Sequence, residues 1–320
     1  MRPGPLTREI PECMRDKYTV VQAIIDVIMF VIVGIGYVIK ATYMTIVGRH
    51  KKDLKGAIAV VTGGGGGLGS LIALRLARLG CTVVLWDINK QGLEDTVKLV
   101  KGIGGKCYGY VVDLTQREDV YRVAKKVDKE VGKTVKAFLP SMIENNDGHI
   151  VTIASMAGHV GVAKLVDYCS SKAAACGFDE ALRLELETQG IKGVRTSLIC
   201  PYFIRSTGMF EEVNSRFVPQ LNSNDVADRV VLAIRTDEPF ALIPGYFRVL
   251  LPFKWLVPWP CISELIRGLV PDAVPVPIPA SRSSPAAAKV ANKPTSLDAK
   301  HGAGAGPMTV LPPARHDRQV

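Results

Sequence analysis

The stretch VVTGGGGGLG, residues 60–69, decides how this chain folds. The apolar run that leads into it predicts a buried strand at 57–62, and the pattern from Leu68 onward predicts a helix at 68–79. Glycines at such a turn leave backbone N–H groups bare and let a pyrophosphate approach the backbone closely. The stretch therefore predicts a phosphate-binding turn, although glycines taken alone fit a flexible loop equally well.

Short β-rich runs then alternate with helical patterns along the chain. Further strands are predicted at 82–86, 108–112, 149–154, 195–200 and 239–244, and further helices at 91–103, 117–131 and 223–236. This alternation is typical of a doubly wound parallel sheet, which binds its ligand at the carboxyl ends of the strands. The sequence therefore predicts an α/β fold of the Rossmann type.

Acidic residues end two of the predicted strands. Asp87 ends the second strand, 24 residues after Gly63, a spacing at which a carboxylate meets the ribose hydroxyls of an adenosine. Because a carboxylate there would repel the extra phosphate of NADP, the expected cofactor is NAD. Asp113 and Leu114, at the end of the third strand, are expected on the adenine side of the same cofactor.

Residues suited to acid–base chemistry follow the predicted strand at 149–154. Ser155 ends this strand, and Tyr168 and Lys172 share one face of a helix at i and i+4. An ammonium beside a phenol favours the phenolate and lowers a pKa that is normally about 10. Tyr168 is therefore the expected acid/base, Lys172 the holder of a nicotinamide ribose, and Ser155 the hydrogen-bond partner of the reacting oxygen.

Together these motifs resemble the short-chain dehydrogenases/reductases over residues 54–271. Pro201 and Thr207 add to the resemblance, because they match the loop that meets the nicotinamide. The resemblance implies a catalytic set of Ser155, Tyr168 and Lys172. The cofactor-binding set that it implies is Thr62, Gly63, Gly67, Leu68, Gly69, Asp87, Asp113, Leu114, Tyr168, Lys172, Pro201 and Thr207.

Within that family, three stretches and an apolar N-terminal segment resemble the epidermal retinol dehydrogenase and 17-beta-hydroxysteroid dehydrogenase-like group. The stretches are VLWDIN at 84–89, KAFLP at 136–140 and CPYF at 200–203. The resemblance implies oxidation or reduction of a lipophilic alcohol or carbonyl at a membrane surface. The implied site is the endoplasmic reticulum membrane or a lipid droplet, with the catalytic domain in the cytosol and a homodimer left open.

The family pattern breaks at 132–134. A fourth strand with an Asn-Asn-Ala-Gly motif, and a helix that carries a catalytic asparagine, are expected there and are missing from the sequence. Because that strand would be central, either the two halves close up or two central strand edges stay unpaired. Two alternatives therefore remain: a catalytically impaired splice or gene-model variant that acts at most as a membrane or lipid-droplet scaffold, or a product that does not fold stably.

Residues 20–47 form the most apolar part of the chain and are long enough to span a bilayer, although Asp26 and Lys40 interrupt them. Basic residues crowd the downstream side, which favours a cytosolic catalytic domain. A spanning helix, a hairpin anchor and a buried core helix all remain open. The expected domains are a polar segment at 1–18, an anchor at 19–47, the NAD-binding domain at 54–271 and a disordered tail at 272–320.

The composition limits the other function classes. The net charge of +10 is spread along the chain without interleaved aromatic residues, so no nucleic-acid partner is expected. Seven cysteines form no CxxC pair, which indicates small core residues in a reducing compartment and supports neither disulfides nor a zinc site. The apolar segment 247–270, with Trp255 and Trp259, fits either a lid over a pocket or a second membrane contact.

Overall fold

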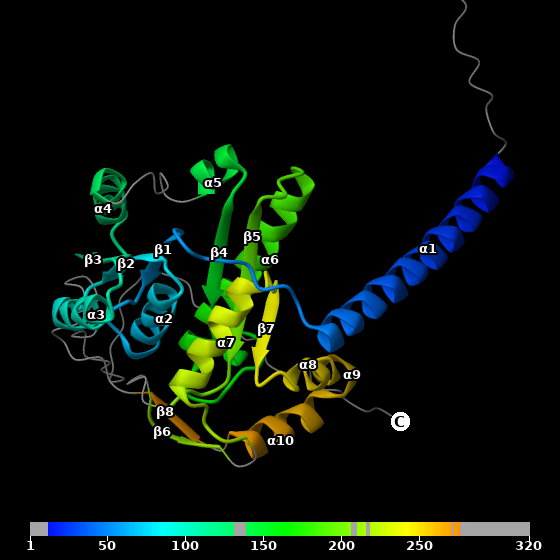
Figure 1. Ribbon diagram of the computed structural model, residues 1–320. Coiled ribbons are helices and arrows are strands. Elements are labelled where there is room, and N and C mark those ends of the chain that lie inside the picture. Colours follow the sequence, from blue (N-terminus) through cyan, green and yellow to red (C-terminus); the bar gives the residue numbers. More distant parts are fainter. Residues whose placement is uncertain (1–11, 131–138, 206–209, 216–217, 271, 276–320) are drawn as a thin grey trace, which may run out of the picture. The chain divides into compact units, whose positions relative to one another are not determined.

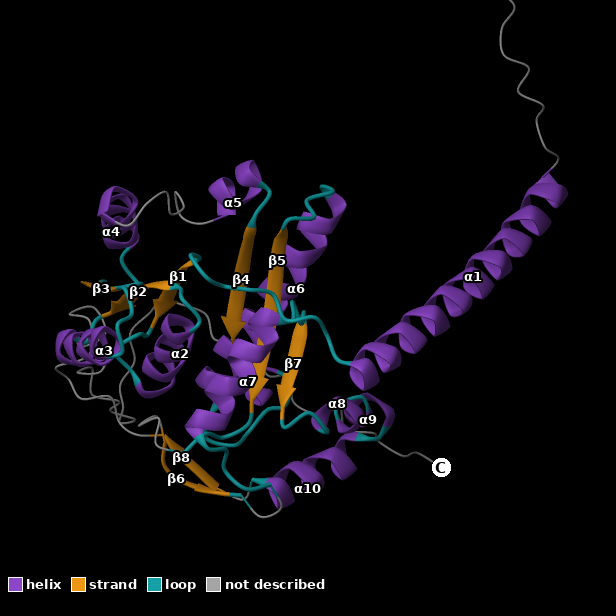
Figure 2. Ribbon diagram, in the orientation of Figure 1, coloured by secondary structure: helices purple, strands orange, loops and turns teal. Residues whose placement is uncertain are grey.

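The structure is a computed structural model, and the residues that it describes are 12–130, 139–205, 210–215, 218–270 and 272–275. Within them, six strands form two separate parallel sheets of three strands each (Figures 1 and 2). The first sheet has the order β1 (Ile58–Thr62), β2 (Thr82–Asp87), β3 (Cys107–Val111). The second has the order β4 (Gly148–Ile153), β5 (Val194–Pro201), β7 (Phe240–Ile243).

Helices connect the strands, as the sequence predicts. The larger ones are α2 (Gly67–Arg78), α3 (Lys90–Gly102), α4 (Arg117–Glu130), α6 (Val166–Thr188) and α7 (Ser223–Arg235). Shorter ones are α5 (Leu139–Asn145), the 3₁₀ turn η1 (Met156–Gly158), α8 (Phe247–Leu250), α9 (Phe253–Leu256) and α10 (Trp259–Leu269). The predicted strands and helices are confirmed to within one or two residues at each end, because their apolar periodicity is strong.

A break runs through the middle of the parallel sheet. Among the described residues, β1 pairs only with β2, and β4 pairs only with β5. Of the two outcomes expected for a missing fourth strand, the structure therefore shows the unpaired edges rather than a closed sheet. The position in the sequence at which that strand is missing, 132–134, lies outside the described residues. It falls between the end of α4 and the start of α5.

An apolar core joins the two sheets where hydrogen bonds do not. One cluster of buried side chains contains Leu85 of the first sheet, Ile199 of the second, and Leu76 and Val230 from α2 and α7. Leu85 and Ile199 have no exposed surface. Since burying a large aliphatic side chain contributes about 1.5–3 kcal/mol, this cluster supplies the main attraction between the halves.

Polar contacts reinforce the same junction. Arg75 of α2 reaches α7, where its Nε lies 2.6 Å from Asp228 Oδ1 and its Nη2 lies 3.1 Å from Asn224 Oδ1. The segment before β1 reaches the second sheet, because Lys52 Nζ lies 2.6 Å from Asp237 Oδ1 and 3.0 Å from His149 Nδ1. The polar contacts of Arg75 and Lys52 thus join the two halves in addition to the apolar core.

A small antiparallel ribbon of β6 (Phe210–Asn214) and β8 (Asp272–Pro275) completes the described strands. The sequence places 272–320 in a disordered tail, so the strand at Asp272–Pro275 is a correction. Its pairing partner lies far away in the sequence, and a four-residue strand carries too little pattern to be recognised alone. Residues 276–320 lie outside the described part of the chain.

The N-terminal helix α1 (Glu12–Val47) contains an apolar segment, Val20–Met44, with a mean hydropathy of 2.3. This segment is long and apolar enough to cross a membrane, and none of its most apolar part is buried in protein. The alternative of a buried core helix therefore finds no support. Asp26, the acidic residue inside the segment, accepts a hydrogen bond from Gln22 one turn earlier at 3.0 Å.

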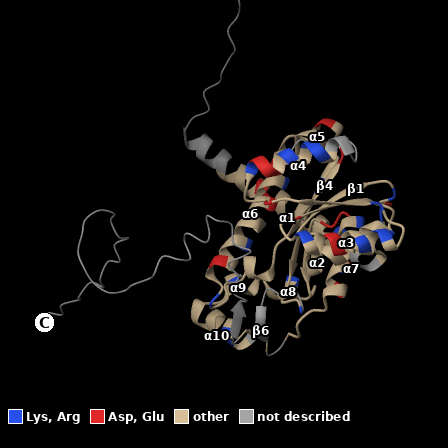
Figure 3. Ribbon diagram, turned by 90° about the vertical axis from the view of Figure 1, so that its left-hand side faces the viewer, with Lys and Arg blue, Asp and Glu red and all other residues tan. Residues whose placement is uncertain are grey.

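Charged residues of both signs are interspersed over the helices of the first sheet. Figure 3 shows Lys or Arg (blue) near Asp or Glu (red) on α3, and the sequence of α4 also contains residues of both signs.

His149 lies in a hydrogen-bonded chain that ties the two halves together. Its Nδ1 accepts from Lys52, so its Nε2–H donates to Ser197 Oγ at 2.9 Å, and Ser197 in turn donates to the Glu238 carbonyl at 2.6 Å. Burial, aided by the Lys52 ammonium, lowers the His149 pKa to about 4. The imidazole is therefore neutral in the folded protein at neutral pH.

This network predicts a pH-dependent stability. Because the His149 pKa is about 4 when folded and 6.5 in the free side chain, the unfolded chain binds the proton first. Stability that is present above pH 6.5 is lost as the pH falls toward 4, by roughly 3 kcal/mol at most. His149→Gln should flatten this loss in urea unfolding followed by fluorescence. Exposed His50→Gln is the control, and equal slopes for wild type and His149→Gln would contradict the prediction.

Candidate active site

The glycine turn between β1 and α2 has the geometry of a phosphate site. Gly63 adopts a φ of +70°, which side chains rarely tolerate, and a Cβ on Gly69 would lie 2.1 Å from the Gly63 carbonyl oxygen. A Cβ on Gly64 would lie 2.9 Å from Leu85. Gly66 caps α2 without a side-chain hydrogen bond, so the first N–H groups of the helix stay available to an anion.

Asp87 accepts one backbone hydrogen bond from the glycine turn and another from Asn89, the residue that caps α3. Its Oδ2 accepts from the Gly65 N–H at 3.0 Å, and its Oδ1 accepts from the Asn89 N–H at 2.9 Å. The N–H groups of Gly63 and Gly64 both donate to the Trp86 carbonyl, which fixes the turn against the end of β2. The negative charge of Asp87 therefore lies at the turn, with carboxylate lone pairs left over for a further donor.

Asp113 has a local role in the structure. Its Oδ1 accepts from the Thr115 N–H at 2.9 Å and from the Thr115 hydroxyl at 2.7 Å, which makes a turn after β3. Leu114 beside it is 51% exposed. These two residues lie at the carboxyl end of β3, as expected.

Ser155, Tyr168 and Lys172 are brought together by β4 and α6. The Ser155 hydroxyl accepts from the Ala157 N–H at 3.1 Å and hydrogen-bonds to the Tyr168 hydroxyl. Lys172 Nζ lies 5.7 Å from the centre of the Tyr168 ring and donates to the Ile153 carbonyl at 3.0 Å. The helix that the i, i+4 spacing predicts is confirmed, and it places phenol, hydroxyl and ammonium in one site.

The acid–base balance of Tyr168 differs from the expectation. Burial raises the Tyr168 pKa, and the hydrogen bond from Ser155 opposes this only in part. The Lys172 ammonium points to the Ile153 carbonyl, so the lowering expected from Lys172 does not dominate. Burial also lowers the Lys172 pKa. The nearby Cys176 and Cys200 sulfurs have the opposite effect and raise this pKa. Tyr168 is therefore a protonated phenol in this state.

A cavity of about 900 Å³ connects these groups. One side is the glycine turn, and another is the group of Ser155, Tyr168 and Lys172. The remaining wall is apolar and comes from the segment after β7, with Phe247, Leu250, Phe253, Ile262 and Leu265 among its members. A polar reacting end and a long apolar wall therefore share one space.

Most of the expected site residues line this cavity, and a few do not. Those that line it are Gly63, Gly67, Leu68, Gly69, Ser155, Tyr168, Lys172 and Pro201. Those that lie outside its lining are Thr62, Asp87, Asp113 and Leu114. Thr207 falls outside the described residues. Asp87 nevertheless touches the turn through Gly65, which places it beside the cavity rather than in its wall.

The sequence missed the residues that shape the substrate side. Tyr202 and Phe203 follow Pro201 directly, so their place after the strand is a signal that could have found them. Met156, Val218 and Tyr246 line the cavity from three different segments. No local pattern marks them, because only the folded chain brings those segments together.

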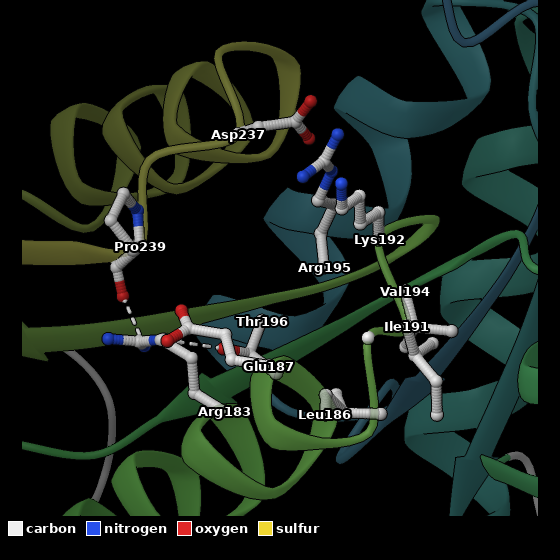
Figure 4. Close-up of a pocket in the computed structure, with 11 residues that line it drawn as sticks. Arg183, Leu186, Glu187, Ile191, Lys192, Val194, Arg195, Thr196, Asp237 and Pro239 are labelled. Carbon is white, nitrogen blue, oxygen red and sulfur yellow. Dashed lines mark hydrogen bonds between the residues drawn. The ribbon is translucent and has the colours of Figure 1, made fainter.

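A second cavity, of about 350 Å³, lies at the opposite end of β5 (Figure 4). Its wall contains Arg183, whose guanidinium donates to Thr196 Oγ1 at 2.8 Å and to the Pro239 carbonyl at 2.7 Å. Arg183 also pairs with Asp179, so its Nε and Nη2 groups both have partners within the protein. None of the expected site residues lines this space, and the larger cavity is the candidate active site.

Comparison with protein families agrees with this geometry. The short chain dehydrogenase family matches at residues 57–135 and 131–217. The two matching segments meet at 131–135, which is where the sequence lacks the fourth-strand unit. Residues that match the family therefore lie on both sides of that junction.

The names of the curated relatives refer to estradiol and to retinol. The chain is 37% identical to human estradiol 17-beta-dehydrogenase 11 over 258 residues, which cover 69% of this chain and 86% of the relative. It is 36% identical to human epidermal retinol dehydrogenase 2 over 261 residues, covering 69% and 84%. The 258 aligned positions include gaps, because 69% of this 320-residue chain amounts to fewer than 258 residues. Part of the relative's sequence therefore has no counterpart in this chain.

A solved structure shows the same fold. The short-chain dehydrogenase/reductase of Burkholderia phymatum in complex with NAD superposes with a TM-score of 0.55 at 23% identity, covering 63% of this chain and 93% of that one. At this identity the likeness shows the fold, which is the α/β fold described above. The chain belongs to the short-chain dehydrogenase/reductase family of oxidoreductases, which use NAD(P), and is related to estradiol 17-beta-dehydrogenase 11 and epidermal retinol dehydrogenase 2.

Proposed function

We propose that this chain is an NAD-dependent oxidoreductase that interconverts a lipophilic alcohol and its carbonyl at a membrane surface. The observation that carries the proposal is one cavity in which the glycine turn, the Ser155, Tyr168 and Lys172 group and a long apolar wall all meet. The relatives named for estradiol and retinol make a steroid-like or retinoid-like substrate the first to test.

The residues at the turn fit a dinucleotide. The bare N–H groups at the start of α2 suit a pyrophosphate, and the close approach of Gly69 to Gly63 leaves no room for a side chain. The bound nicotinamide would supply the acceptor or donor of a hydride. The Asp87 carboxylate at the turn favours ribose hydroxyls over a phosphate, which supports NAD rather than NADP.

The catalytic work falls to three side chains. A substrate oxygen placed beside the Tyr168 hydroxyl would also meet the Ser155 hydroxyl, because these two groups already hydrogen-bond to one another. Tyr168 gives its proton to this oxygen in reduction, and in oxidation its deprotonated phenolate form accepts the proton of the alcohol. With its pKa raised by burial, Tyr168 holds the proton that reduction requires. Lys172 holds the nicotinamide ribose beside Tyr168.

The cavity wall supports entry of the substrate from a membrane. Leu250, Phe253 and Leu265 line the cavity and are also 54%, 53% and 56% exposed, so the mouth is apolar. Trp255 and Trp259 on the same segment are 78% and 69% exposed. We infer that α9 and α10 contact the bilayer to which α1 anchors the chain, at the endoplasmic reticulum or a lipid droplet, with the catalytic domain in the cytosol.

The unpaired edges of β1 and β4 favour one second candidate, a membrane-bound scaffold with an impaired site. These edges flank the place where a dinucleotide lies in a doubly wound sheet. The scaffold predicts membrane attachment and a cellular effect that both survive Tyr168→Phe.

The decisive prediction concerns Tyr168. Detergent-solubilised full chain should bind NADH and turn over retinol or a steroid alcohol, and Tyr168→Phe should lower kcat/KM by roughly 10²–10⁴-fold because the proton carrier is lost. NADH binding, followed by fluorescence, should weaken far less than kcat/KM falls. Tyr121→Phe on α4 is the matched control. The proposal is rejected for this chain if the wild type neither binds NADH nor turns over substrate, while a form with a fourth-strand unit inserted does both.

A second prediction concerns cofactor choice. Asp87→Asn removes the charge that repels a 2′-phosphate, so the preference for NADH over NADPH should fall by about tenfold, equivalent to about 1.4 kcal/mol. Paired titrations of the two cofactors measure the ratio, and Asp95→Asn on the exposed face of α3 is the control. An unchanged ratio, with the melting temperature preserved, would show that Asp87 does not select the cofactor.

A third prediction concerns the membrane contact. The chain has three tryptophans, and Trp86 is 1% exposed whereas Trp255 and Trp259 are largely exposed. In vesicles that contain brominated lipid, tryptophan fluorescence should be quenched, and the double variant Trp255→Phe, Trp259→Phe should lose the quenching. Trp86, which remains in that variant, serves as the internal control. Equal fractional quenching before and after the substitutions would place α9 and α10 away from the bilayer.

A further inference from the structure

Three side chains with soft donor atoms gather behind the catalytic group. His159 follows η1, Cys176 lies on α6 and Cys200 lies near the end of β5, so three separate elements contribute one donor each. Their donor atoms all lie within 4.8 Å of one another. None of the three lines the large cavity, and the acid–base chemistry proposed above does not use them.

The spacing of these atoms matches a tetrahedral metal site. The His159 Nε2 atom lies 3.4 Å from Cys200 Sγ and 3.7 Å from Cys176 Sγ. With Zn–S near 2.3 Å and Zn–N near 2.05 Å, a tetrahedral angle requires an N to S separation of about 3.6 Å. The two measured separations bracket this value, so the three donors could bind one ion without movement of the backbone.

The surroundings hold the donors in place. Cys200 is fully buried and Cys176 is 8% exposed. Gly158 makes room for the Cys176 sulfur, because a Cβ there would lie 2.7 Å from Sγ. The His159 ring packs edge-on against Phe240, with 5.6 Å between the ring centres. These contacts fix the ring and the thiol from two sides.

The local charge also fits a divalent cation. Cys176 and Cys200 both interact electrostatically with the ammonium of Lys172. Two thiolates with one divalent ion form a neutral centre, which can lie beside the Lys172 ammonium without repulsion between net charges. Sulfur and imidazole ligands favour Zn²⁺ over the hard cations Mg²⁺ and Ca²⁺. Three protein ligands leave the fourth position to water.

We propose that His159, Cys176 and Cys200 bind one zinc ion, which ties the end of β5, the turn after β4 and α6 together behind Tyr168 and Lys172. The ion would act as a clamp, because its ligands touch neither the substrate cavity nor the phosphate turn. It would stabilise the half of the fold that carries Ser155 and Tyr168, where β4 pairs on one side only within the described part of the chain.

Cobalt titration of the full chain, freed of metal with a chelator, tests the proposal. One equivalent of Co²⁺ should produce thiolate-to-cobalt charge-transfer absorption and the visible bands of a tetrahedral site, and Zn²⁺ should displace it. Cys176→Ser should abolish the charge-transfer contribution of that thiolate and weaken Zn²⁺ binding by more than about 100-fold, beyond the cost of losing an outer-shell partner. Cys107→Ser, at a buried cysteine outside the cluster, should change neither.

Two further measurements keep the test independent of how well the variant folds. In the wild-type chain, Zn²⁺ should slow alkylation of Cys176 and Cys200, read by peptide mass spectrometry, and leave exposed Cys261 unchanged. Zn²⁺ should also raise the wild-type melting temperature. Less than stoichiometric metal, absorption that is the same in Cys176→Ser, or a Cys176 to Cys200 disulfide under reducing conditions would overturn the proposal.

Discussion

The fold depends on an apolar core that spans a broken sheet. Leu85 of β2 and Ile199 of β5 are fully buried in one cluster with α2 and α7, although the first and second sheets share no strand pairing among the described residues. A backbone N–H or carbonyl that is left without a partner when buried costs about 1–3 kcal/mol. The residues of β1 and β4 are half-buried or exposed, so their unpaired edges need not carry that full cost, and the core keeps the glycine turn within one cavity of Ser155.

That same geometry explains the chemistry of the site. The cavity buries Tyr168, and this burial sets its proton affinity more strongly than the charge of Lys172 does. The wall from α8 to α10 is apolar, and several of its side chains are themselves exposed. A site with these properties suits a water-insoluble substrate, because the same apolar surface serves the pocket and its entrance.

Much of the fold and part of the site could be predicted from local pattern. The strands and helices follow apolar periodicity. Tyr168 and Lys172 share a helix face because residues four apart always do so in an α-helix. The strand at Asp272–Pro275 could not be predicted, since its partner β6 lies far along the chain. The expected effect of Lys172 on Tyr168 was also wrong, because a pattern of residues does not show how deeply a phenol is buried or where an ammonium points.

The sequence by itself determined the strand–helix order, the glycine turn, the acidic residue that ends β2 and the serine, tyrosine and lysine set. Each of these depends on neighbours within one turn or one strand end. Only the tertiary structure decided how the missing unit is accommodated, which side chains wall the cavity, and that His159, Cys176 and Cys200 meet. Those outcomes depend on burial and on contacts between distant segments, and the spacing of cysteines along the chain carries no record of them.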